Sequence, residues 1–98
     1  MIRGFRDRGT EDAFNGKNTP ATRRTCPRSV WNAAFRKVDQ IDSAIVLSDL
    51  AIPPGNRLEA LKGDRKGQHS IRINGQFRIC FRWTEAGASE VQIVDYHR

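Results

Sequence analysis

Residues 58–83 read LEALKGDRKGQHSIRINGQFRICFRW and carry the clearest secondary-structure signal in the chain. Polar and apolar residues alternate over residues 70–74 and again over residues 77–83. Because neighbouring side chains on a β-strand point to opposite faces, this alternation predicts two strands. The turn between them contains Gly75, and glycine supplies the positive φ that tight hairpin turns need. The stretch therefore predicts a strand, a basic turn and then a two-stranded hairpin.

The predicted hairpin has two chemically different faces. Guanidinium groups occupy one face, at Arg78 and Arg82, with Cys80 between them. Large apolar residues occupy the opposite face, at Phe77, Ile79, Phe81 and Trp83. Because guanidinium groups pair well with phosphates and carboxylates, we expect the apolar face to be buried and the arginine face to stay open and bind an anion.

The rest of the chain predicts helices before strands. Apolar residues recur at three- and four-residue spacings over residues 27–45 and predict one helix that covers the sheet, with Trp31 and Phe35 in the core. We also expect an edge strand at residues 1–5, a short helix at 10–14 capped by Thr10, a loop at 15–27, a last helical turn at 48–51, a turn at 84–89 and a final strand at 90–94. This order indicates an α+β fold with an antiparallel-rich sheet. The apolar positions of the long helix are Val30, Trp31, Ala34, Phe35, Val38, Ile41 and Ile45.

Length and composition restrict the class of protein. The 98 residues support one modest hydrophobic core, so residues 1–98 are interpreted as a single domain. No apolar run approaches the ~20 residues that span a bilayer, and no secretory signal is visible, so we expect a cytoplasmic protein without a membrane partner. Cys26 and Cys80 form no CxxC or Cys/His cluster, so neither a disulfide framework nor a metal or other cofactor is expected.

Positive charge is concentrated in the first third of the chain. The net charge is +6, and residues 1–37 hold nine Lys and Arg against three Asp and Glu. Such a surplus attracts polyanions through counterion release. Charge alone leaves three interpretations open, namely nucleic acid, an acidic protein partner, or simple solubility.

Two groups of residues could carry chemistry. One is the basic turn at residues 62–67, which lacks the spacing of a Walker loop. The other is the terminal Asp95-Tyr96-His97, which by itself could equally be a frayed tail. Cleavage of RNA without a metal needs proton-transfer groups and cations on the phosphate. Lys62, Arg78 and His97 would suffice if they met on one sheet face.

Four segments of the chain resemble the HigB branch of the RelE/ParE toxin superfamily, also called plasmid maintenance system killer proteins. They are LxxLKGDRxG from Leu58, SIRIN from Ser70, RICFxW from Arg78 and VDYH from Val94. The resemblance implies the compact α+β fold of RelE-like microbial RNases. It also implies a toxin of a type II toxin–antitoxin module that cleaves mRNA in the ribosomal A site, without metal, by attack of the 2′-OH on the adjacent phosphate.

The resemblance also implies partners and roles for individual residues. The partners would be the ribosome with its mRNA and a HigA-type helix-turn-helix antitoxin, and operator DNA would be bound only through the antitoxin complex. By position, Lys62 and Arg78 match cations on the scissile phosphate. His97 would transfer the proton, Tyr96 would orient the mRNA base, and Asp95 would support both. RNA or ribosome contacts are expected at Arg65, Lys66, Arg72 and Arg82.

Two positions depart from this pattern or stand outside it. Glu59 stands where the family has a catalytic histidine, and a carboxylate can accept a proton but also repels a polyanion. His69 matches no family position and shares strand parity with Ile71, so we expect it near the core face or the turn. Asp95 and His97 share strand parity with Val91 and Ile93, which are expected in the core. Either the strand ends or bulges near Val94, or Tyr96 alone faces the site.

The resemblance leaves two alternative functions open. One is a ParE-like toxin that inhibits gyrase on the same fold and needs no proton-transfer residues. The other is a basic RNA-binding module that does not cleave RNA. Cleavage of mRNA in a translation reaction separates both from an mRNA endonuclease.

Overall fold

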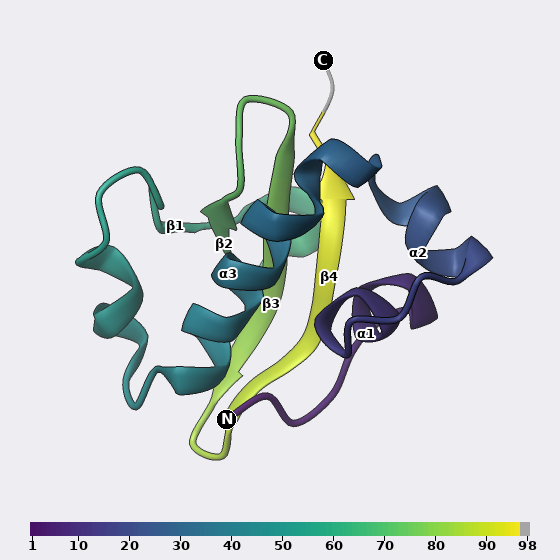
Figure 1. Cartoon of the computed structure of the whole chain (residues 1–98). Helices are drawn as coiled ribbons and strands as arrows, with labels where there is room; N and C mark the ends of the chain where they lie inside the picture. The colour runs from purple at the N-terminus through teal and green to yellow at the C-terminus, as the bar shows by residue number, and fades with distance from the viewer. Residues whose placement is uncertain (97–98) are drawn as a thin grey trace.

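The computed structural model describes residues 1–96 and confirms the α+β fold (Figure 1). Within these residues no helix is long and apolar enough to cross a membrane. The helices precede the strands along the chain, except for one short helical turn between the first two strands. The elements are α1 (Arg8–Phe14), α2 (Pro20–Thr25), 3₁₀ helix η1 (Arg28–Val30), α3 (Trp31–Ser43), η2 (Leu47–Ala51), β1 (Glu59–Ala60), η3 (Gly63–Arg65), β2 (His69–Arg72), β3 (Phe77–Thr84) and β4 (Gly87–Asp95).

The four strands form one antiparallel sheet in the order β1-β2-β3-β4. The predicted hairpin is confirmed, with β2 and β3 paired so that Ser70 lies opposite Cys80 and Arg72 opposite Arg78. The Asn74 side chain closes the turn, because its carbonyl oxygen accepts the N–H groups of Gln76 and Phe77 at 2.8 Å each. Directly opposed residues share a face, so this register sets two arginines side by side.

Helix α3 crosses one face of the sheet and forms the core with it (Figure 1). Val38 and Ile41 of α3 are buried against Ile71, Ile79 and Phe81, all at or near zero exposure. Burial of each such large side chain stabilises the fold by roughly 1.5–3 kcal/mol. The apolar face of the hairpin is therefore the sheet's contribution to the core, as the alternation predicts.

The long helix is shorter than its apolar pattern predicts, and two of its residues are not in the core. Phe35 is 46% exposed and Ile45 is 87% exposed. The Phe35 ring packs against Phe14 of α1, with ring centroids 6.2 Å apart, and does not reach the sheet. Ile45 follows the end of α3, where the chain becomes extended at Ala44. The prediction that Phe35 packs in the core is wrong, and the predicted helix ends before Ile45.

The first 27 residues are more helical than predicted. The predicted loop contains α2, with Pro20 in its first turn and the Thr19 hydroxyl capping the N–H of Thr22. Helix α1 begins before the predicted start, because Asp7 rather than Thr10 is its N-cap. A cap forms where a side-chain oxygen reaches a free N–H in the first turn. The residue types alone do not decide which of several neighbouring oxygens does so.

The N-terminus runs beside β4 without forming the predicted edge strand. Ile2 and Phe5 make isolated parallel bridges to Ala88 and Val91. Gly87 permits this approach, since a Cβ there would collide with the carbonyl oxygen of Met1. The N-terminal segment therefore supplements β4 at two points only.

Strand β4 is longer than predicted and contains an irregularity opposite Phe81. The register shifts by one residue between the pairs Cys80–Gln92 and Arg82–Ser89, and Glu90 has φ +50°. An extra residue of this kind is a β-bulge. It lies upstream of Val94, so β4 continues regularly to Asp95.

We expect Thr10→Val to destabilise the protein, because the Thr10 hydroxyl is fully buried and accepts the backbone N–H of Ile93 at 2.9 Å. The substitution leaves a buried N–H of β4 without an acceptor, at a cost of roughly 1–3 kcal/mol of unfolding free energy. Urea unfolding measures it. The control is Thr25→Val, whose hydroxyl donates to Ala21 within α2. Equal stability of Thr10→Val and wild type would contradict a role for this bond.

Candidate active site

Three arginines and one tyrosine line a pocket of about 230 Å³ at the end of the sheet where β2 turns into β3. The residues come from the segment before β1, the end of β2, the hairpin turn, the start of β3 and the residue after β4. We call it the arginine pocket. Its lining residues are Arg57, Arg72, Asn74, Gly75, Arg78 and Tyr96. Among residues 1–96 no acidic residue lines the pocket, so it is suited to an anion.

Arg78 is the most constrained side chain of the arginine pocket. Its Nε donates to the Ser70 hydroxyl at 2.8 Å, and its Nη2 donates to the backbone carbonyl of Arg57 at 2.8 Å. The side chain is only 12% exposed. The Tyr96 ring lies against the guanidinium, with 5.8 Å between Cζ and the ring centroid, a cation–π contact. Arg78 therefore presents a cation of fixed orientation.

Arg57 belongs to the site although the sequence did not single it out. It lines the pocket, and its φ of +49° is in the left-handed region that residues with a Cβ seldom adopt. That conformation accompanies the hydrogen bond from Arg78 to its carbonyl. In the sequence Arg57 stands in the run from Pro53 to Leu58, after a turn and directly before β1, and no pattern there marks it as a site residue.

A buried asparagine holds the segment that carries Arg57. The Asn56 side chain is fully buried, donates to Gln40 and to the Leu50 carbonyl, and accepts from the Lys37 ammonium at 2.5 Å. The backbone carbonyl of Asn56 accepts the backbone N–H of Arg72 at 2.6 Å. Burial lowers the pKa of Lys37, and neighbouring Arg36 lowers it further. Asn56 thus ties α3 to the backbone of the arginine pocket.

Glu59 of β1 forms an ion pair with Arg78 in the arginine pocket. Its Oε1 lies 3.2 Å from Nη2 of Arg78, and the Glu59 side chain is 53% exposed. The two strands place it there, since Glu59 pairs with Ser70 and Ser70 bonds Arg78. A carboxylate in this place competes with any bound anion for Arg78.

The terminal residues divide between the two faces of the sheet. Tyr96 lies in the arginine pocket, and its N–H donates to the Gln76 carbonyl at 2.6 Å. Asp95 pairs with the buried Phe77 and accepts from the Gln76 side chain at 3.1 Å, so it is on the other face and does not line the pocket. Of the alternatives for this strand end, the regular strand with Tyr96 at the site is correct. His97 lies outside the described residues.

The other predicted cations lie outside the arginine pocket. Lys62 and Lys66 are exposed at the two ends of η3. Arg65 donates to Gln68 and Gln92, which places it over the middle of the sheet's polar face. Arg82 is paired with Glu90 at 2.9 Å, further along β3. The structure therefore brings Arg72, Arg78 and Tyr96 together and leaves these four cations outside the arginine pocket.

The polar face is covered where it was expected to be open. Ser70 and Cys80 are both fully buried on it. Burial raises the pKa of the Cys80 thiol, while nearby Arg65 and Arg78 act in the opposite direction. A thiol that is buried and protonated is a poor nucleophile, so Cys80 is a packing residue beneath the arginines.

His69 is on the core face, as its parity with Ile71 predicts. It pairs with Phe81 across the hairpin, and the rings stack with centroids 6.4 Å apart. Its Nδ1 is buried without a hydrogen-bond partner. His69 is therefore separated from the arginine pocket by the sheet.

Across residues 1–96 no group of three or more His, Cys, Asp or Glu is arranged to hold a metal ion.

Comparison with known proteins gives concordant matches. A family described as RelE-like toxin of type II toxin-antitoxin system HigB matches residues 3–97. The chain is 43% identical to Toxin HigB-1 of Vibrio cholerae over its whole length and 99% of that protein. It is 29% identical to Endoribonuclease HigB of Proteus vulgaris over 99% of this chain and all of that one. A YoeB–YefM complex from Staphylococcus aureus has a chain with the same fold, with a TM-score of 0.58 at 14% identity over 100% and 99% of the two chains.

We expect Glu59→Gln to strengthen binding of a fluorescent single-stranded oligodeoxynucleotide, because it removes the carboxylate that pairs with Arg78. The gain should be roughly two- to five-fold in dissociation constant, since a half-exposed ion pair is worth up to about 1 kcal/mol. Fluorescence anisotropy measures it. Glu85→Gln makes the same charge change in an exposed turn and is the control. An equal gain in both variants would show only a general charge effect.

Proposed function

The chain belongs to the HigB family of RelE-like toxins of type II toxin–antitoxin systems, and from this premise we propose that it is an endoribonuclease that cuts mRNA on the ribosome. The observation that carries the proposal is the arginine pocket, where Arg57, Arg72 and Arg78 surround a space next to Tyr96. A phosphodiester carries the negative charge that such a pocket attracts. Tyr96 supplies an aromatic face for a neighbouring base.

The proposed reaction is an internal transesterification of RNA. The ribose 2′-oxygen attacks the adjacent phosphorus while the bond from phosphorus to the 5′-oxygen breaks, which leaves a 2′,3′-cyclic phosphate and a 5′-hydroxyl. Negative charge on the phosphoryl oxygens increases toward the transition state. Arg78, held by Ser70 and the Arg57 carbonyl, is oriented to stabilise that charge without rearrangement. The chemistry itself requires no metal.

Two residues are proposed for proton transfer. His97 follows Tyr96 directly and would protonate the leaving 5′-oxygen, since an imidazole exchanges protons near neutral pH. Glu59 would accept the 2′-OH proton, because its carboxylate is held at the cation that binds the phosphate. Asp95 lies on the opposite face of the sheet from the arginine pocket, so no part in the proton transfer is proposed for it. Lys62 would add a cation where the RNA enters.

Dependence on the ribosome is proposed from the shape of the site. A small pocket at the end of a sheet contacts one phosphate and one base, so it supplies little of the order that the RNA backbone needs for in-line attack. A ribosome holds mRNA in a defined conformation. Contacts to ribosomal RNA are proposed for Arg65, Lys66 and Arg82, beyond the arginine pocket.

The proposed partner is a HigA-type helix-turn-helix antitoxin, through which the complex would bind its operator DNA. An antitoxin partner follows from membership in a toxin–antitoxin family. The HigA type and the cytoplasmic location are proposals from the sequence resemblance.

We expect Arg78→Ala to lower mRNA cleavage in a cell-free translation reaction by about 100-fold or more, because it removes a fixed cation from the phosphate. Primer extension on the mRNA measures cleavage. The control Arg23→Ala removes the same charge from α2, where the Arg23 guanidinium donates to Asn18. Circular dichroism checks that both variants fold.

Three results would contradict this prediction. Full cleavage by folded Arg78→Ala would remove the arginine pocket from the mechanism. Intact mRNA on ribosomes that bind wild-type protein would indicate a non-cleaving RNA-binding module. Inhibited supercoiling by gyrase with intact mRNA would indicate a ParE-like toxin.

A further prediction tests whether Glu59 takes part in proton transfer or only competes with the phosphate for Arg78. If Glu59 accepts the 2′-OH proton, Glu59→Gln lowers the cleavage rate of ribosome-bound mRNA about 100-fold, because general-base catalysis contributes 10²–10⁴. Single-turnover kinetics at saturating toxin measure that rate. An undiminished rate would leave Glu59 as a competitor of the phosphate only.

A further inference from the structure

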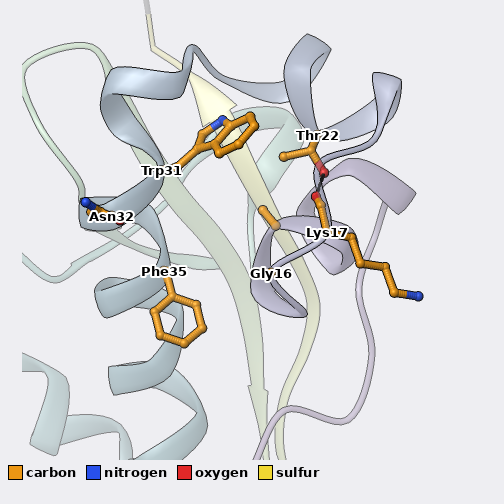
Figure 2. Close-up of a pocket in the computed structure, with 7 residues that line it drawn as sticks. Gly16, Lys17, Thr22, Trp31, Asn32 and Phe35 are labelled. Carbon is orange, nitrogen blue, oxygen red and sulfur yellow. Dashed lines mark hydrogen bonds between the residues drawn. The ribbon is translucent and has the colours of Figure 1, made fainter.

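A second pocket of about 300 Å³ lies on the helical side of the sheet, away from the arginine pocket. Helix α3 contributes Trp31, Asn32 and Phe35, α1 contributes Ala13, the connection between α1 and α2 contributes Gly16 and Lys17, and α2 contributes Thr22. Figure 2 shows the Trp31 indole extending from α3 toward Thr22, with Phe35 one turn further along the helix. We call this hollow the aromatic cleft.

The walls of the aromatic cleft are held in place by the protein itself. Trp31 donates its indole N–H to the Cys26 carbonyl at 3.1 Å, and Phe35 stacks on Phe14 with an interplanar angle of 26°. A partner therefore meets a pocket whose shape already exists. Preformed pockets lined by aromatic residues are typical sites where a partner inserts an anchor side chain.

The polar side chains that line the cleft are those of Lys17, Thr22 and Asn32. The Thr22 hydroxyl already donates to the Lys17 carbonyl at 2.8 Å, the bond drawn in Figure 2. A nucleobase has several hydrogen-bonding groups on its edge, which this lining would leave unpaired at a cost. An aliphatic or aromatic side chain has no such groups. The lining therefore favours a protein anchor over an RNA base.

Charge around the cleft indicates what surrounds that anchor. Lys17 lies at the rim, and its ammonium extends outward from the cleft in Figure 2. The Arg28 guanidinium lies 5.6 Å from the centroid of the Trp31 ring. In the part of the chain that the structure describes, no acidic residue lines the cleft. A complementary segment carries carboxylates on either side of a bulky apolar residue.

We propose that the aromatic cleft binds an acidic segment of the antitoxin that inserts one bulky apolar side chain between Trp31 and Phe35. This proposal rests on the toxin–antitoxin assignment and is independent of RNA cleavage. It explains why a large aromatic residue, Phe35, remains 46% exposed in the free chain.

The test measures binding of the antitoxin encoded in the reading frame next to the toxin gene, by calorimetry without ribosomes. Phe35→Asp should weaken binding about thirty-fold or more, because a central aromatic anchor contact is lost. Ile52→Asp is the control, since Ile52 is 76% exposed and lies outside the cleft. Cleavage of mRNA by Phe35→Asp should stay within two-fold of wild type.

Lys17→Glu keeps the test decisive if Phe35→Asp fails to fold, since Lys17 is an exposed residue between α1 and α2. It should slow association several-fold at low salt and less at high salt. Arg23→Glu is its matched control.

Unchanged antitoxin affinity in folded Phe35→Asp or Lys17→Glu would overturn the proposal. Loss of RNA affinity with unchanged antitoxin affinity would make the cleft an RNA site. Failure of the wild type to cleave mRNA would count against the nuclease function only.

Discussion

Arg78 can face a phosphate only because the β2–β3 register fixes the groups that hold it. That register places Ser70 beneath its Nε and Arg72 directly opposite. A shift by one residue would turn Arg78 toward the core, where an unpaired guanidinium is strongly disfavoured. The hydrophobic face of the hairpin, buried under α3, makes such a shift costly. The packing that stabilises the fold is therefore also what orients the site.

The sequence predicted what depends on local periodicity and missed what depends on distant contacts. Alternation over residues 77–83 was enough to find β3 and both of its faces, because strand orientation repeats every two residues. The exposure of Phe35 depends on where α1 packs, and the place of Arg57 depends on the network around Asn56. Neither the exposure of Phe35 nor the position of Arg57 produces a periodic pattern in the sequence. Of the predicted site residues, Arg72, Arg78 and Tyr96 meet in the pocket, and Asp95 lies on the opposite face.

The two sides of the sheet carry different chemistry. The arginine pocket is charged and small, and the aromatic cleft is apolar with cations at its rim. The proposals above assign a phosphate of RNA to the first and an acidic segment of the antitoxin to the second. Helix α3 links them, since it supplies Trp31 to the cleft and Lys37 to the network that holds Arg57 in place.

The central claim is that the arginine pocket holds a phosphate while the neighbouring 2′-oxygen attacks it. The chemical ends of the RNA fragments test this most directly, by mass spectrometry of mRNA cut on ribosomes by the purified protein. The account predicts a 2′,3′-cyclic phosphate or its hydrolysed form on the upstream fragment and a 5′-hydroxyl on the downstream one. A 3′-hydroxyl and a 5′-phosphate would contradict it, because they require attack by water.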